Sequence, residues 1–226
     1  MTLPPRTESP QSSSRPGQAC RVALLLAAAA MTAACDQALT IPDQFPAPLV
    51  ETLPLRVGVH YPDAYRDYTY TEAAGGDTEW SIRAGEANVA MFDSVCQRLF
   101  RETVRLDAPP APGTATGYDA YLEPSIEAFE FATPGQSGTN QYSVWIRYRL
   151  KVYDRDGTLV TTWPVSAYGQ SASSTLQPAR SMQEATVLAM RDAAATISTG
   201  FPKQKAIRRQ LLEPGTAKEA DRNGSP

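Results

Sequence analysis

The stretch YSVWIRYRLKV, residues 142–152, has the most regular pattern in the chain. Its apolar and polar residues alternate one by one, which indicates a β-strand with one buried face. The face expected to be buried carries Tyr142, Val144, Ile146, Tyr148, Leu150 and Val152. The opposite face carries Ser143, Trp145, Arg147, Arg149 and Lys151. A shift of one residue would bury three cations, so the pattern strongly fixes the register of this strand.

A second strand is predicted upstream, where residues 120–128 alternate in the same way. Glu123 and Glu127 lie on its polar side, so antiparallel pairing with residues 142–152 would place them near the arginines. Phe129 and Phe131 fall out of phase with the alternation. Their positions predict a bulge or a twist near the end of the strand.

A hairpin turn is predicted at DRDG, residues 154–157, where Gly157 supplies a positive φ. The return strand should run from Leu159 to about Tyr168. Pro164 lies within it, and proline has no N–H to donate to a neighbouring strand. We therefore expect the return strand at the edge of the sheet, or bulged at Pro164.

The flanking segments add shorter strands and two helices. Alternation and turn residues predict strands over residues 55–61, 67–72, 78–84 and 103–106, the middle two forming a hairpin. Apolar residues at helical spacing predict helices over about 86–100 and 181–199, the second opening with a capping box at Ser181–Glu184. Each helix has one apolar stripe. We therefore predict an α+β fold, with a mostly antiparallel sheet and two helices packed on one of its faces.

The segment RVALLLAAAAMTAAC, residues 21–35, has the layout of an export signal. A basic residue precedes a short apolar run, and small residues lead into Cys35. The run is about half as long as the roughly 20 residues that a membrane-spanning helix needs. A cysteine at this point indicates a lipoprotein, in which residues 1–34 are removed and Cys35 is acylated. The alternative is an ordinary secretory signal cut after Ala34, because Thr32 stands where lipoprotein signals usually have leucine.

Removal of the signal changes the charge and the cysteine content. The loss of three arginines and one glutamate lowers the net charge from −3 to −5, which argues against a nucleic-acid partner. Acylation of Cys35 would leave Cys96 as the one remaining thiol, on the apolar face of a predicted helix. An unmodified Cys35 would instead make a Cys35–Cys96 disulfide conceivable in an oxidising compartment.

The mature chain divides into three parts. Residues 35–54 hold four prolines and no periodic pattern, which is typical of an extended spacer between a lipid anchor and a domain. Residues 55–212 suit a single domain. Residues 213–226 read as a disordered tail.

Residues for catalysis or metal binding form no familiar motif. His60 is the single histidine, and the sequence has no HExxH, CxxC or GxSxG. Glu123, Glu127 and Glu130 could act as catalytic carboxylates, but strand glutamates opposite arginines are more often structural pairs. We therefore expect no enzymatic activity, no cofactor and no bound metal.

Aromatic residues provide two candidate contact surfaces. One is a set of tyrosines, Tyr65, Tyr68 and Tyr70, that could line a glycan or lipid groove; half-buried strand residues at a sheet edge are the simpler interpretation. The other is Trp145 beside Arg147 and Arg149. An arginine stacked on the indole would explain this second group equally well.

Five stretches resemble a family of uncharacterised bacterial lipoproteins. They are LPLRVGVHY (53–61), GEANVAMFD (85–93), YDAYLEPSIEAFEF (118–131), YSVWIRYRLKVYDRDG (142–157) and the alanine-rich helix before Gly200-Phe201. They span most of residues 50–212. More distantly, the layout resembles ABC-transport auxiliary lipoproteins and the lipoprotein plug subunit of the lipopolysaccharide translocon, which are small sheets with two helices. The shared stretches are structural, so the resemblance carries over no functional residue.

Together these observations favour a periplasm-facing lipoprotein held through Cys35 at the inner or the outer membrane. The tether, the spacer and the lack of a catalytic pattern favour a non-enzymatic accessory subunit of an envelope assembly or transport complex, with an envelope protein as partner. The alternative is a lipid- or glycan-binding module.

Overall fold

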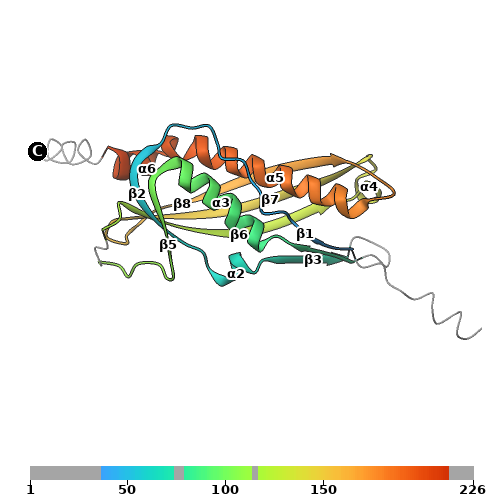
Figure 1. Ribbon diagram of the computed structural model, residues 1–226, viewed down its shortest axis with the longest axis horizontal. Helices are drawn as coiled ribbons and strands as arrows, with labels where there is room; N and C mark the ends of the chain where they lie inside the picture. Colours follow the sequence, from blue (N-terminus) through green and yellow to red (C-terminus); the bar gives the residue numbers. More distant parts are fainter. Residues whose placement is uncertain (1–36, 74–78, 114–116, 214–226) are drawn as a thin grey trace, which may run out of the picture. The chain divides into compact units, whose positions relative to one another are not determined.

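A computed structural model describes residues 37–73, 79–113 and 117–213 (Figure 1). Outside the described residues lie the predicted signal at 1–34, the lipidation candidate Cys35 and residues 214–226 of the predicted tail. In the described part, two mixed sheets and two long helices build an α+β fold.

The strands belong to two sheets. The main sheet has five strands, which in spatial order are β5 (Phe100–Leu106), β2 (Leu53–His60), β6 (Ala120–Ala132), β7 (Gln141–Asp154) and β8 (Leu159–Ala172). The smaller sheet has three, β1 (Gln37–Thr40), β4 (Glu79–Arg83) and β3 (Thr69–Ala73). Two long helices, α3 (Gly85–Leu99) and α5 (Pro178–Gly200), accompany them.

Several short helical segments connect these elements. They are α2 (Asp63–Arg66), α4 (Pro134–Ser137), a 3-10 turn (Phe201–Lys203), α6 (Lys205–Ile207) and a π-helical turn (Arg208–Leu212). A capping box lies at α4, where Thr133 and Gln136 cap each other. It lies in the connection between β6 and β7.

The strand predicted from residues 142–152 is confirmed as the central part of β7. All six residues expected on its buried face are buried, and Trp145, Arg147 and Arg149 are exposed on the other. β7 pairs antiparallel with β6 and with β8. β8 lies at the edge of the sheet, as Pro164 predicts.

The predicted irregularity in β6 is a bulge. The pairing passes from Ile126 to Ala128 and leaves Glu127 as the extra residue. Because side chains alternate between faces, one extra residue returns Phe129 and Phe131 to the buried face. Both phenylalanines are buried there.

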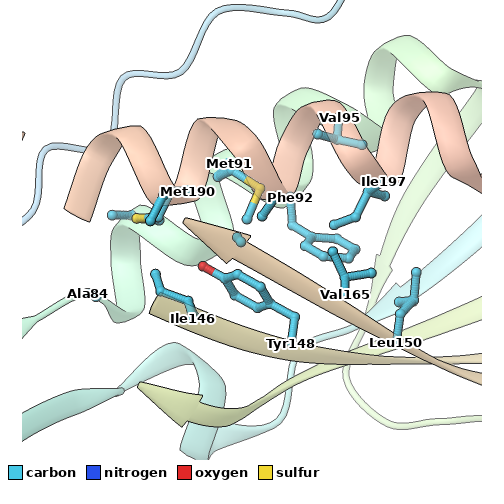
Figure 2. Close-up of a cluster of buried hydrophobic side chains, with 14 of the residues drawn as sticks. Ala84, Met91, Phe92, Val95, Ile146, Tyr148, Leu150, Val165, Met190 and Ile197 are labelled. Atoms are coloured by element: carbon cyan, nitrogen blue, oxygen red, sulfur yellow. The ribbon is translucent and has the colours of Figure 1, made fainter. Parts of the chain in front are cut away.

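The two long helices pack on one face of the main sheet, as predicted. Figure 2 shows Met190 and Ile197 of α5, with Phe92 and Val95 of α3, above side chains of β7 and β8. The packing of α5 on β8 is close: a Cβ on Gly169 would lie 2.2 Å from the carbonyl oxygen of Ala185. A small residue on each element therefore makes this distance between strand and helix possible.

The main sheet is mixed, so the prediction of a mostly antiparallel sheet holds only in part: β6, β7 and β8 pair antiparallel, but other strands do not. β2 pairs in parallel with both β5 and β6, and in the smaller sheet β1 pairs in parallel with β4. The physical reason lies in the connection, because α3 carries the chain back along the sheet before β5 begins, and such a crossover joins parallel strands. The predicted hairpin does form, as β3 and β4, but in the smaller sheet.

The predicted spacer over residues 35–54 is largely folded against the domain. Residues 37–40 form β1, and Leu39 and Ile41 are buried. Further along, the Ser94 hydroxyl donates to the Phe45 carbonyl at 3.4 Å, and the Thr52 hydroxyl donates to the Arg98 carbonyl at 3.2 Å. The sequence did not predict β1, because Leu39 and Ile41 are only two alternating apolar residues and a proline-rich segment follows them directly.

The predicted start of the second helix is also corrected. α5 begins at Pro178, so Ser181 lies inside the helix and is buried, and no side chain caps the helix. Proline is favoured in the first turn of a helix, where its missing N–H costs nothing. The helix ends at Gly200, one residue past the predicted end, and Phe201 continues in a helical conformation.

Among the helices in the described ranges, none is both long enough and apolar enough to cross a membrane.

Candidate functional site

The face of the main sheet opposite α3 and α5, which we call the open face, is exposed along much of β7 and β8. Its outward positions on β8, from Thr162 to Gln170, are all solvent-exposed. The open face collects polar and aromatic side chains from four strands: His60, Glu123, Glu127, Trp145, Arg147, Arg149, Lys151 and Tyr168. Alternation along β7 places Trp145, Arg147 and Arg149, the candidate contact surface identified from the sequence, together on this face.

Glu123 is the most strongly paired residue of the open face. It accepts from Lys151 Nζ at 2.8 Å and lies 3.2 Å from His60 Nδ1, and its side chain is 14% exposed. Burial raises the pKa of this carboxyl, but the hydrogen bonds and charges of Lys151 and His60 outweigh burial and leave the pKa below its ordinary value. Glu123 is therefore held as a carboxylate by its neighbours.

Glu127, the bulged residue, forms an ion pair with Arg149. The predicted proximity of strand glutamates to the arginines of β7 is thus confirmed for Glu127, whereas Glu123 pairs with Lys151 instead. Each carboxylate is engaged by a neighbouring side chain, which is the arrangement of structural pairs.

Two exposed aromatic rings lie side by side on the open face. Trp145 and Tyr168 occupy opposite positions on β7 and β8, and their ring centroids are 5.2 Å apart. Trp145 is 44% and Tyr168 41% exposed. The Tyr168 hydroxyl donates to Gln170 Oε1 at 2.6 Å and lies 3.2 Å from the Ser143 hydroxyl, so the ring is held in place. The pair forms a fixed aromatic platform.

Arg147 lies next to this platform at the edge of a shallow depression. Its cross-strand neighbours are small, Ala128 on β6 and Ser166 on β8, which leaves space on both sides. The depression holds about 260 Å³ and includes Trp145 and Glu130 in its wall. Among the described residues, no carboxylate lies within ion-pairing distance of Arg147, whereas Arg149 is paired. An exposed guanidinium beside two aromatic rings can bind an anionic or planar group.

The predicted stacking of an arginine on Trp145 does not occur in the described structure. The cation–π contacts found there join Arg56 to Tyr118 at 5.1 Å and Arg105 to Tyr61 at 5.6 Å. The indole of Trp145 contacts the ring of Tyr168 instead.

The tyrosines of the second candidate surface do not line a common groove. Tyr65 is buried, stacks on Tyr61 with a centroid distance of 5.9 Å, and donates to the Asn88 carbonyl. Burial raises the pKa of its hydroxyl. Residues 63–66 form the short helix α2 instead of a strand, and this turns Tyr65 into the core. Tyr65 is therefore not part of a contact surface.

Tyr68 and Tyr70 lie apart from the open face. The ring of Tyr70, on β3, packs against Phe129 with a centroid distance of 4.8 Å. Tyr68 lines a separate hollow beside Arg66 and Thr40, and burial raises its pKa to about 12. Their use as half-buried packing residues matches the simpler of the two interpretations.

Tyr168 was not identified from the sequence, because of a second bulge. The pairing of β7 with β8 shifts between Val152 and Tyr153, so one extra residue enters β8 near the hairpin turn. Counting back from the turn without this bulge would place Ala167 opposite Trp145. The exposed position of Tyr168 in the alternation is the one signal that points to it.

Cys96 is buried on α3, as predicted, and burial raises the pKa of its thiol. Over residues 37–73, 79–113 and 117–213, no group of three or more histidine, cysteine or acidic side chains lies close enough to hold a metal ion.

The fold and the open face define a class: a mixed α+β domain with two helices on one sheet face and a polar, aromatic surface on the other. No family model matches the chain, and no curated protein matches it.

Solved structures with a similar arrangement share little sequence with this chain. A Xanthomonas campestris protein of family DUF330 is 12% identical, with 80% of this chain and 99% of that chain covered and a TM-score of 0.46. A candidate lipoprotein from Caulobacter crescentus is 15% identical, with 58% and 80% covered and a TM-score of 0.33. A hypothetical protein from Chlamydia trachomatis is 10% identical, with 63% and 96% covered and a TM-score of 0.39. At these scores the likenesses carry no argument about family or function.

Proposed function

We propose that this protein is a lipoprotein, anchored through acylated Cys35 and facing the periplasm, that serves as a non-enzymatic accessory subunit of an envelope assembly or transport complex. The observation that carries the proposal is the segment at residues 21–35, in which a basic residue, a short apolar run and small residues lead into Cys35. Because β1 begins at Gln37, two residues after the cysteine, acylation of Cys35 would hold the folded domain close to the membrane.

The open face is the proposed docking surface for the envelope partner. Tryptophan, tyrosine and arginine are the residues enriched at the energetic centres of protein interfaces. Here Trp145, Tyr168 and Arg147 lie together and exposed, and Arg147 has no carboxylate partner among the described residues. We therefore expect the partner to present an acidic side chain to Arg147 and an apolar one to the two rings.

The anchor is tested by the intact mass of the protein extracted from membranes with detergent. The expected mass is that of residues 35–226 with a diacylglyceryl group on Cys35. A product of the same length with a free thiol at residue 35, or protein retained in the cytosol, would show that the proposed anchor does not exist.

The docking surface is tested by affinity purification of the lipidated protein from detergent extract, where a stoichiometric membrane partner is expected. Arg147→Glu and Trp145→Ala should each weaken partner affinity by about 2 kcal/mol or more, roughly 30-fold, if these residues are at the centre of the interface. The matched control is Arg191→Glu, a charge reversal at an exposed position of α5. Full recovery of the partner by the open-face variants would exclude this surface, and a partner-free monomer would exclude the accessory role.

The second candidate function is binding of a lipid or glycan, and the aromatic platform beside the 260 Å³ depression favours it. Native mass spectrometry of protein purified from membranes should then show a retained ligand that Trp145→Ala loses. A spectrum containing only the protein and its anchor would retire this function.

A further inference from the structure

The first described residue, Gln37, lies at one end of the main sheet. Gln37 pairs with Trp80, whose indole ring lies 5.8 Å from the ring of Tyr142 at the start of β7. Gln37, Trp80 and Tyr142 line a hollow of about 430 Å³, together with residues from the β6–β7 and β8–α5 connections. We call this region, formed by Gln37 and residues 133–141 and 171–177, the anchor end.

The two connections that form the anchor end are joined to each other. The N–H of Ser173 donates to the carbonyl of Asn140 at 3.0 Å. In Figure 1, α4 and the first turn of α5 lie at this same end. The position of β1 is fixed against α5 as well, because the Gln183 side chain donates to the Thr40 carbonyl at 2.7 Å.

Covalent geometry limits how far the anchor can lie from this end. An extended chain advances at most about 3.6 Å per residue, so residue 35 lies within roughly 7 Å of Gln37. β1 lies near the start of the region predicted as a spacer, and the rest of that region, residues 41–54, follows β1 and contacts α3. A lipid on Cys35 therefore places the anchor end close to the bilayer.

The composition of the anchor end fits that position. One residue in five of the whole chain is charged, yet the connections TPGQSGTNQ (133–141) and SASSTLQ (171–177) contain no charged residue. Leu176 projects from the second connection and is 90% exposed. These two neutral connections, bordered by exposed Glu79 on β4 and exposed Arg180 in the first turn of α5, can approach lipid headgroups without stripping water from charges of their own. An exposed leucine can enter the boundary with the acyl chains.

We propose that the anchor end rests on the headgroup layer of the membrane that holds the lipid anchor, with Leu176 at the boundary of the acyl chains. This inference rests on the proposed acylation of Cys35. The strands of the main sheet then lead away from the bilayer: Leu159 begins β8, and Ala172 ends it about 43 Å away at about 3.3 Å per residue. The open face stands beside the membrane, free for a partner.

The test uses the full lipidated protein in phosphatidylcholine vesicles containing brominated lipid. Leu176→Cys carries a thiol-reactive fluorophore at the anchor end, and Leu159→Cys, at the opposite end of β8 and also exposed, is the matched control. The introduced thiol is labelled selectively, because acylation occupies Cys35 and Cys96 is 1% exposed. We expect brominated lipid to quench the label at position 176 several-fold more than the label at position 159.

Equal quenching at the two positions, or stronger quenching at position 159, overturns the inference. Intact mass separates this failure from a failure of the proposed function. An acylated protein without preferential quenching overturns the orientation alone, whereas an unmodified Cys35 overturns both.

Discussion

Charged residues close together on the open face differ in whether they have a partner of opposite charge. Glu123 lies between Lys151 and His60, while Arg147, two residues before Arg149 on β7, has no acidic partner among the described residues. Paired charges hold strands together, and an unpaired exposed guanidinium remains free for a ligand or a partner. The difference comes from the residues opposite: Glu123 is opposite Lys151, but Arg147 is opposite Ala128 and Ser166.

The pairing of Glu123 predicts a specific dependence of stability on pH. Because its pKa in the folded protein lies below the ordinary value of about 4.3, its contribution to stability is present above that pH and is lost as the pH falls through the folded-state pKa. Glu123→Gln should lower the free energy of unfolding at pH 7 by about 1 kcal/mol, since hydrogen bonds to a charged group are lost. The difference from the wild type should shrink below about pH 4.

Urea unfolding at pH 7 and at pH 3.5 measures both effects. Glu130→Gln is the control, because Glu130 lies on the same strand and is exposed, and it should change stability by less than about 0.5 kcal/mol. Equal effects of the two substitutions at both pH values would contradict the assignment.

At the residue scale, sequence patterns identified the exposed and the buried side of β7 correctly, but they could not show that Tyr65 is buried or that Tyr168 lies opposite Trp145. Strict alternation determines the faces of a long strand whatever its partners are. Tyr65 lies in a four-residue helix that is too short for a periodic signal. Tyr168 reaches its position opposite Trp145 through a bulge, and a bulge depends on the pairing of two strands, not on one strand alone.

At the scale of elements, the contact between β8 and α5 depends on Gly169. A Cβ at this position would lie 2.2 Å from both the Ala185 carbonyl oxygen and the Ala189 nitrogen, which are backbone atoms that cannot rotate away. Gly169→Ala should therefore push α5 off the sheet and destabilise the protein by about 1–3 kcal/mol, the usual cost of overpacking.

Thermal unfolding followed by circular dichroism measures this change. The matched control is Gly135→Ala in α4, where the nearest atom to an added Cβ is 3.9 Å away. It should leave the melting temperature nearly unchanged. A Gly169→Ala variant as stable as Gly135→Ala would show that α5 can shift without cost.

The existence of the helices and long strands was predictable, but the direction of pairing in the main sheet was not. Local patterns determine α3, α5, β6, β7 and β8, because each has enough turns or alternations to show a period. Strand direction depends on where a crossover returns the chain, and the sequence contains no local signal for that. For β1 the obstacle was length, since four residues between an uncertain leader and a proline-rich segment show no period.

At the scale of the whole molecule, β1 attaches the N-terminal segment to the folded domain. Leu39 and Ile41 are 6% and 2% exposed, and β1 pairs with β4 along its full length. The combined substitution Leu39→Ala and Ile41→Ala removes the apolar contacts that hold the strand. We expect faster amide hydrogen exchange at residues 37–40, with the exchange of β7 unchanged.

Hydrogen exchange with mass spectrometry resolves the two regions separately. Leu49→Ala is the control, because Leu49 belongs to the same N-terminal segment but is 96% exposed. It should leave exchange in β1 at the wild-type level. Unchanged exchange in the double variant would mean that the backbone pairing with β4 alone holds β1.

The parallel pairing of β2 also determines when, during folding, neighbouring strands can pair with it. Its neighbours begin at Phe100 and Ala120, which follow Leu53 by 47 and 67 positions. β6, β7 and β8, in contrast, follow one another along the chain, so their pairing closes only short loops. In the proposed export route the N-terminus emerges first. Val57 and Val59 of β2 therefore remain exposed to solvent until β5 and β6 have also crossed the membrane. This interval is when a periplasmic chaperone would have the most apolar surface to bind.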